Sequence, residues 1–191
     1  LVLGVALQTA PPPLADAYYF FIQGRILEGR GNTSGAITAH KRAIELQPGA
    51  SALHAELAGL YARAGRIADA IAEGIRRMVV RGAPAIGCAA AYGVALHALS
   101  HQNATTPDFD KTLDHAFEVL AASRPTAVNL FWALQRMREA WAACQTLSPP
   151  QVAQQLLQAA HDLLAQDLSI NRAMGEHGAA LLPDGARVLT H

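Results

Sequence analysis

The 191-residue sequence contains little cysteine and no excess of either charge, and each scarcity argues against a class of protein. The two cysteines, Cys88 and Cys144, support neither a disulfide framework nor a zinc site, so we expect two small buried thiols in helices. Basic and acidic residues number 15 each, the pI is near 7.3, and no basic stripe stands out. This balance argues against nucleic acid as the main partner.

Long apolar runs are also scarce. Residues 1–10 are mostly apolar and precede three prolines, but they are too short to span a bilayer. They lack a basic flank and a clean cleavage site, so they are either the tail of a signal-peptide core or, more simply, a ragged start. We expect no other segment to be long and apolar enough for a membrane. The apolar share of 51% predicts a sizeable core instead.

Histidine, by contrast, is plentiful, with 8 residues. His97 and His101 have the i, i+4 spacing of a helical metal pair, but no carboxylate lies between them and no third ligand is implied. We interpret them as surface histidines and expect no metal site. His115 and His161 stand beside aspartates on solvated helix faces, and His177 receives a structural role at a helix end. No nucleophile elbow, P-loop or dinucleotide fingerprint occurs.

The first third of the chain, after residues 1–13, repeats with a period of 34 residues over 14–72. The matching pairs are Gly24 with Ala58, Leu27 with Tyr61, Gly31 with Gly65, and Ala36-Ile37 with Ala70-Ile71. This is the period of the tetratricopeptide repeat, a helix–turn–helix unit. Residues 17–48 resemble one full repeat, and 51–64 resemble the first helix of a second, with Ser51 as its N-cap.

The second repeat is interrupted inside its second helix, which we expect to continue from Ile67 through Arg81. Arg77 and Gly82 stand where Ala43 and Pro48 stood in the first repeat. Such repeats bury their faces only by stacking, so one and a half of them must lean on the helices that follow.

The remaining sequence reads as helices, and the fold class is therefore mainly all-α. The apolar stripes predict helices over 84–99, 109–122 and 126–144, and a long one that starts after 148–150 and runs towards 175 or 178. A turn at 183–185 precedes a predicted strand over 187–190. We therefore divide the chain into a ragged start (1–13), repeats (14–72), a helical domain (73–182), and the start of a truncated α/β domain (183–191).

Residues 78–87 carry a pattern suited to a phosphate. Arg81, Gly82 and Ala83 stand directly before Pro84, which is favoured at the first helical position. The free N–H groups and dipole of the helix start favour an anion, and an arginine adds a planar fork for two phosphate oxygens. Taken alone, this pattern is also typical of a tight turn with a solvated arginine.

A second segment, 123–132, has the same arrangement of an arginine and a proline, Arg124 and Pro125, before a predicted apolar helix. With these residues in place, the segments 81–87, 123–133 and 175–185 together resemble the methylthioribose-1-phosphate isomerase family. That family is related to the alpha-type regulatory subunits of translation initiation factor 2B and to ribose-1,5-bisphosphate isomerase. The resemblance covers about residues 73–191.

The resemblance implies that Arg81, Gly82, Ala83 and Arg124 contact a sugar phosphate. It also implies a cytoplasmic, homodimeric enzyme of methionine salvage, an aldose–ketose isomerase that needs no added cofactor. The family's catalytic cysteine and aspartate would follow His191, and neither Cys88 nor Cys144 matches that cysteine. We therefore expect binding groups without acid–base machinery, and no turnover from residues 1–191.

Two alternatives stay open at this point. The chain is a fragment of such an isomerase preceded by tetratricopeptide sequence, or it is chiefly a tetratricopeptide-type module that binds a protein partner. The join between the two parts is either a natural fusion or a misjoined reading frame.

Overall fold

A computed structural model describes residues 14–187 and 189 of the chain. Within these residues the protein is made of helices, as the apolar periodicity predicted. The helices are α1 (Leu14–Gly29), α2 (Thr33–Leu46), α3 (Ser51–Arg63), α4 (Ile67–Arg76), α5 (Ala83–His101), α6 (Thr106–Ala121), α7 (Val128–Ala142) and α8 (Pro149–Ala180). Residues 1–13, to which the signal-peptide question belongs, lie outside the described part.

The strand predicted over 187–190 is not formed at its described positions. Arg187 and Leu189 have no regular secondary structure, and residues 188 and 190 lie outside the described part. A strand is stable only beside another strand, and residues 14–187 and 189 contain none with which it could pair.

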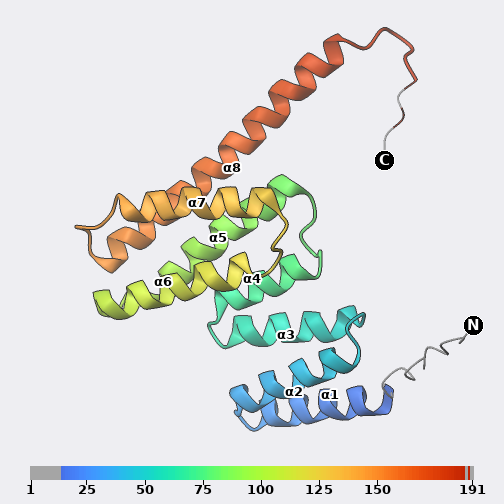
Figure 1. Cartoon of the computed structure of the whole chain (residues 1–191), viewed down its shortest axis with the longest axis vertical. Coiled ribbons are helices and arrows are strands. Elements are labelled where there is room, and N and C mark those ends of the chain that lie inside the picture. The colour runs from blue at the N-terminus through green and yellow to red at the C-terminus, as the bar shows by residue number, and fades with distance from the viewer. Residues whose placement is uncertain (1–13, 188, 190–191) are drawn as a thin grey trace, which may run out of the picture.

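Helices α1 to α4 form two successive hairpins stacked at one end of the molecule (Figure 1). Gly31 and Gly65, 34 positions apart, adopt the same left-handed conformation, with φ of 75° and 72°. In each turn the following residue donates its N–H five residues back, from Asn32 to Leu27 and from Arg66 to Tyr61, both at 2.9 Å. The sequence period is therefore a structural repeat as well.

Small residues let α1 and α2 approach closely, as the repeat pattern predicted. A Cβ on the buried Gly24 would lie 2.9 Å from the ring of His40, while Ala36 and Ala43 are fully buried. The N-cap of α3, however, is Ala50 rather than Ser51, and no side chain caps this helix. That prediction was wrong by one residue, because Ser51 already begins the helix.

Helix α4 ends earlier than the sequence predicted. It stops at Arg76, where Met78 takes a left-handed conformation with φ of 58°. The N–H of Val79 then bonds to the carbonyl of Gly74 at 3.0 Å, which repeats the turn seen at Gly31 and Gly65. The expected helix through Arg81 is therefore broken by a helix-terminating turn.

Helix α5 forms the centre of the main core, packed by α4, α6, α7 and α8. Its small residues, among them Ala91, Val94 and Ala98, are fully buried. The second hairpin joins this core through α4, whose Ala68, Ala72 and Ile75 belong to it. The first hairpin packs on the second through α2 and α3.

The apolar character of α5 corrects one expectation. By length and composition this 19-residue helix could cross a membrane, although no segment was expected to qualify. Half of the apolar stretch of α5 is buried inside the protein, because α4, α6, α7 and α8 pack around this helix. Its hydropathy is that of a core helix.

Helix α8 has two unlike parts. Ser148 and Gln151 form a capping box at its start, and its buried residues run from Pro149 to Leu163. Beyond Leu163 the helix continues to Ala180 with mostly exposed side chains, and it projects away from the bundle (Figure 1).

Candidate functional site

The start of α5 presents free backbone donors, as the residues around Pro84 suggested. Gly82 is the N-cap with φ of 89° and no side chain caps the helix; Pro84 is the second helical residue, one later than predicted. The N–H groups of Ala83 and Ala85 have no acceptor within the helix. Nothing lies within 4 Å of a Cβ placed on Gly82, so the helix end is open.

Arg81 lies exposed beside this helix end. Its Nε donates to the carbonyl of Met78 at 3.0 Å, which tethers the side chain across the turn. The terminal guanidinium nitrogens make no hydrogen bond with other described residues, so they are available to an anion.

The helix after Arg124 and Pro125 begins at Val128, two residues later than predicted. Residues 124–127 form a turn in which the N–H of Ala127 bonds to the carbonyl of Arg124 at 3.0 Å, and α7 begins at Val128. The ring of Pro125 keeps the preceding residue out of the helical region, which places the turn before the helix. Arg124 is half-buried, and Ala127 caps α7 without a side-chain bond.

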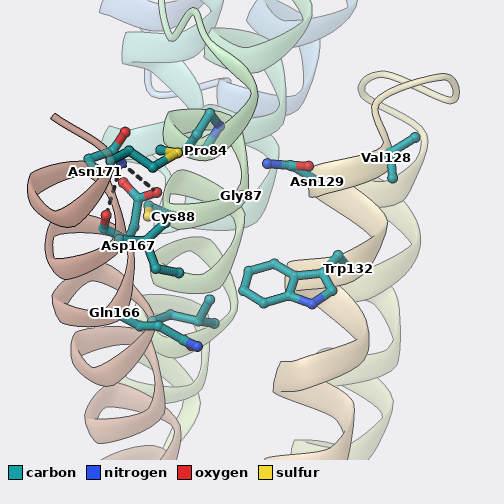
Figure 2. Close-up of a pocket in the computed structure, with 12 residues that line it drawn as sticks. Pro84, Gly87, Cys88, Val128, Asn129, Trp132, Gln166, Asp167 and Asn171 are labelled. Atoms are coloured by element: carbon teal, nitrogen blue, oxygen red, sulfur yellow. Dashed lines mark hydrogen bonds between the residues drawn. The ribbon is translucent and has the colours of Figure 1, made fainter. Parts of the chain in front are cut away.

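The first turns of α5 and α7 meet at one cavity of about 380 Å³ (Figure 2). Pro84, Gly87 and Cys88 line it from α5, and Val128, Asn129 and Trp132 from α7. The third wall is α8, which contributes Leu163, Gln166, Asp167, Ile170, Asn171 and Met174. The cavity therefore joins the two helix starts to a helix that lies far along the chain.

Asp167 is the charged group of this wall. Asn171 Nδ2 donates to its carbonyl at 2.9 Å and to its carboxylate at 3.1 Å, which holds the side chain in place (Figure 2). Burial, and then the Asp167 carboxylate, raise the pKa of the Cys88 thiol. The lining of the cavity thus includes a carboxylate and a thiol without activation, and no lysine or arginine.

Neither arginine lines the cavity. The structure brings together the helix starts that follow Arg81 and Arg124, but it shows no contact between the two side chains. The α8 wall was missed in the sequence, because Asp167 and Asn171 lie in an ordinary amphipathic pattern with no motif.

The cysteines differ from the prediction of two buried thiols in helices. Cys144 is buried but lies just past α7, and its pKa is raised by burial. Cys88 lies within α5 but is partly exposed, because it borders the cavity.

One histidine prediction was also wrong. His97 is buried, with 5% of its surface exposed, since it lies on the side of α5 that faces the turn before α4 and helix α6. His101 is half-buried, whereas His115, His161 and His177 are exposed. Among the described residues no group of three or more His, Cys, Asp or Glu side chains could hold a metal ion.

The described part of the chain is thus a helical domain in which two arginine-preceded helix starts border one cavity. Residues 79–191 match the initiation factor 2 subunit family, and the chain belongs to that family. The match begins directly after the turn at Met78 that ends α4.

Named relatives are methylthioribose-1-phosphate isomerases. The protein from Albidiferax ferrireducens is 63% identical over 121 residues, which cover 63% of this chain and 34% of the relative. The protein from Syntrophotalea carbinolica is 52% identical over 123 residues, covering 64% of this chain and 36% of the relative.

Two solved structures are similar in fold. The 5-methylthioribose 1-phosphate isomerase from Pyrococcus horikoshii superposes with a TM-score of 0.60 at 39% identity, over 62% of this chain and 33% of that one. The translation initiation factor eIF-2B, subunit delta, from A. fulgidus gives a TM-score of 0.57 at 40% identity, over 63% of this chain and 35% of that one. The chain thus spans about a third of the length of the relatives it matches.

Proposed function

We propose that residues 79–191 are part of an isomerase that converts 5-methylthioribose 1-phosphate to 5-methylthioribulose 1-phosphate. The observation that carries the proposal is the meeting of two uncapped helix starts at one cavity, each preceded by an arginine. The identity of 63% to a methylthioribose-1-phosphate isomerase supports it. The family resemblance adds a cytoplasmic location, a homodimer for the whole enzyme, and no added cofactor.

In this proposal Arg81, Gly82, Ala83 and Arg124 hold the phosphate. The open N–H groups of α5 and the terminal nitrogens of Arg81 would donate to its oxygens, and the dipoles of both helices favour its charge. Gly82 has no side chain to block the approach of the anion. Arg124 would supply a second charge from the turn before α7.

Binding of the sugar phosphate to the purified chain tests the proposal. We expect affinity near the millimolar range, roughly −4 kcal/mol, because exposed arginine–phosphate contacts are individually weak. Arg81→Gln and Arg124→Gln should each weaken binding severalfold. Arg30→Gln removes the same charge from the exposed end of α1 and should change nothing. Equal affinity in all four proteins would refute the proposed phosphate site.

Turnover is a separate measurement on the same samples. We expect no ketose from residues 1–191, since the resemblance places the catalytic cysteine and aspartate after His191. Ketose formation well above background, abolished by Arg81→Gln or Arg124→Gln, would show that the catalytic groups had been misplaced.

We propose for residues 14–72 a tetratricopeptide-type role in binding a protein partner. The matching turns at Gly31 and Gly65 favour it, as does the stacking of α1 to α3. Tyr18 and Tyr19 are 64% and 61% exposed on α1 and are natural anchor residues for a partner.

A pull-down with the full chain tests this role. A specific partner should be retained by the wild-type chain and lost from the Tyr18→Ser/Tyr19→Ser variant, while Trp132→Ser on α7 should keep it. Failure to retain any protein, or equal retention by all three, would contradict the proposal. Amplification of the source DNA across the codons for residues 70–77 tests whether the join is natural.

A further inference from the structure

A second cavity, of about 310 Å³, lies where the turn between α3 and α4 meets α5 and α6. It shares no lining residue with the cavity at the starts of α5 and α7. Its walls are Ala64, Gly65, Arg66 and Asp69 from the repeat, His97 and His101 from α5, and Lys111, Thr112 and His115 from α6. The cavity therefore lies between the hairpin repeat and the family-matched domain.

His97 is the buried polar side chain of this cavity. It is 5% exposed, and neither ring nitrogen has a hydrogen-bond partner, although the backbone of Thr112 lies near the ring. The ring of His101 stacks on it at 4.2 Å between centroids and offers no bond. Buried polar groups in native proteins are nearly always paired, and one left unpaired costs about 1–3 kcal/mol. A polar ligand in the cavity would remove that cost.

The charged groups around His97 favour an anion. Lys111 faces the cavity from α6, together with the imidazoles of His101 and His115. Asp69 is the carboxylate of the lining, and Arg66 already pairs with both of its oxygens at 2.8 and 3.0 Å. Lys111 Nζ lies 4.0 Å from Asp108, a highly exposed pair that contributes little and does not occupy the ammonium.

The start of α4 borders the cavity through Arg66, its N-cap, and Asp69. The first helical residues, Ile67 and Ala68, do not line the cavity. A cation fits less well, because the described residues around His97 do not form a metal-holding group.

We propose that this cavity binds a small oxyanion, a phosphate or a carboxylate, with His97 donating a ring N–H and Lys111 supplying the opposing charge. The site is independent of the proposed isomerase function. An anion held there contacts both the repeat and the family-matched domain, and so fastens one to the other.

Proton linkage follows from the same geometry. Burial, and then His101 and His115, lower the pKa of His97 to about 4, so the ring is neutral near pH 7 without a ligand. The backbone of Thr112, and then Asp69, act in the opposite direction and raise this pKa, and a bound anion beside the ring would raise it further. Binding would then take up a proton, and affinity would increase as the pH falls from 7 towards 5.

Titration of the full chain with inorganic phosphate at constant ionic strength tests the proposal. Binding is monitored by calorimetry and by the NMR resonances of the His97 ring. Arg81→Gln/Arg124→Gln serves as the background, so that binding at the proposed sugar-phosphate site does not contribute. We expect His97 to shift on addition of phosphate, and Lys111→Gln to weaken binding about tenfold. Lys41→Gln, which removes the other lysine of the chain on α2, should leave binding unchanged.

His97→Gln gives a second readout, and Lys111 is exposed enough for its variant to fold if His97→Gln does not. Succinate in a parallel titration distinguishes carboxylate from phosphate. Equal binding by wild-type and Lys111→Gln chains, or an unshifted His97 at saturating phosphate and succinate, would overturn the proposal. Loss of phosphate binding in the Arg81→Gln/Arg124→Gln background would also overturn it, and would leave the proposed isomerase site intact.

Discussion

Gly87 of α5 packs tightly against the backbone of Asn129 in α7. A Cβ on Gly87 would lie 3.0 Å from the carbonyl oxygen of Asn129 and 3.4 Å from the Cβ of Ala133. Both contacts fall in the first two turns of the helices, beside the shared cavity. The absence of a side chain at Gly87 therefore sets how close the two helix starts lie.

Gly87→Ala should destabilise the protein by about 1–2 kcal/mol. The added methyl meets a backbone carbonyl of a packed helix, and such overpacking costs about 1–3 kcal/mol, of which helix propensity returns up to about 1. Denaturant unfolding measures the change.

Gly175→Ala is the matched control, since nothing lies within 4 Å of its Cβ position on the exposed part of α8. It should stabilise slightly, by about 0.5–1 kcal/mol. Equal effects of the two substitutions would contradict close packing at Gly87.

Met78→Gly should stabilise the protein by about 0.5–1 kcal/mol, because a left-handed conformation costs a non-glycine residue about 1–2 kcal/mol and glycine returns part of this as chain entropy. The Met78 side chain is 47% exposed, so little packing is lost. Thermal unfolding measures it. Gly31→Ala makes the reverse change in the matching turn and should destabilise; stabilisation by both would disprove a common turn.

Glu73→Ala should cost about 3 kcal/mol of stability, because it leaves a buried polar partner uncompensated. Glu73 is 4% exposed; it bonds to Nδ1 of His54 and to Arg76. His54 Nε2 lies 3.2 Å from the carbonyl of Pro48, so both ring nitrogens of His54 face acceptors.

A double-mutant cycle with His54→Ala measures the coupling across α3 and α4. We expect about 1–3 kcal/mol, as for groups in one hydrogen-bonded network. Additive losses would mean that the two side chains act separately.

Stability should fall as the pH drops from 6.5 to 4. The pKa of His97 is about 4 in the folded protein and 6.5 for the free side chain. Between these two pH values the unfolded chain binds a proton at His97 that the folded protein does not bind, which stabilises the unfolded state. The loss should reach about 3 kcal/mol. Burial lowers the pKa of His40 as well, which adds in the same direction.

Unfolding in phosphate-free and carboxylate-free buffers across this range, with His97→Leu alongside, measures the contribution. The variant should show a shallower decline. An identical slope in both proteins would assign the acid sensitivity to other groups.

The helices could be predicted from the sequence because their apolar periods and turn glycines are local signals. The 34-residue repeat was visible for the same reason, and the structure reproduces it at Gly31 and Gly65. The end of α4 could not be predicted, since the left-handed residue there is a methionine rather than a glycine. The strand over 187–190 failed where it could be checked, because strand propensity without a neighbour does not define a strand.

The site was predictable only in part. Arg81 and Arg124 stood out through their proline neighbours, yet only folding shows that Pro125 belongs to a turn and that Asp167 borders the same cavity. The burial of His97 was hidden because α5 is apolar on most sides and gives no sign of which face meets which neighbour. These are long-range relations, and periodicity does not encode them.

The two parts of α8 differ in how cooperatively they unfold with the rest of the protein. Up to Leu163 the helix is held by side chains in the core, so its backbone opens only when the bundle opens. Beyond that point its side chains are mostly exposed and border other helices only along the cavity wall, as far as Met174. Its hydrogen bonds there depend chiefly on the helix itself, and a helical stretch of that length is only marginally stable in water. One continuous helix therefore contains a steep gradient of local stability, so amide protons near Ala180 should exchange with solvent long before those near Leu156.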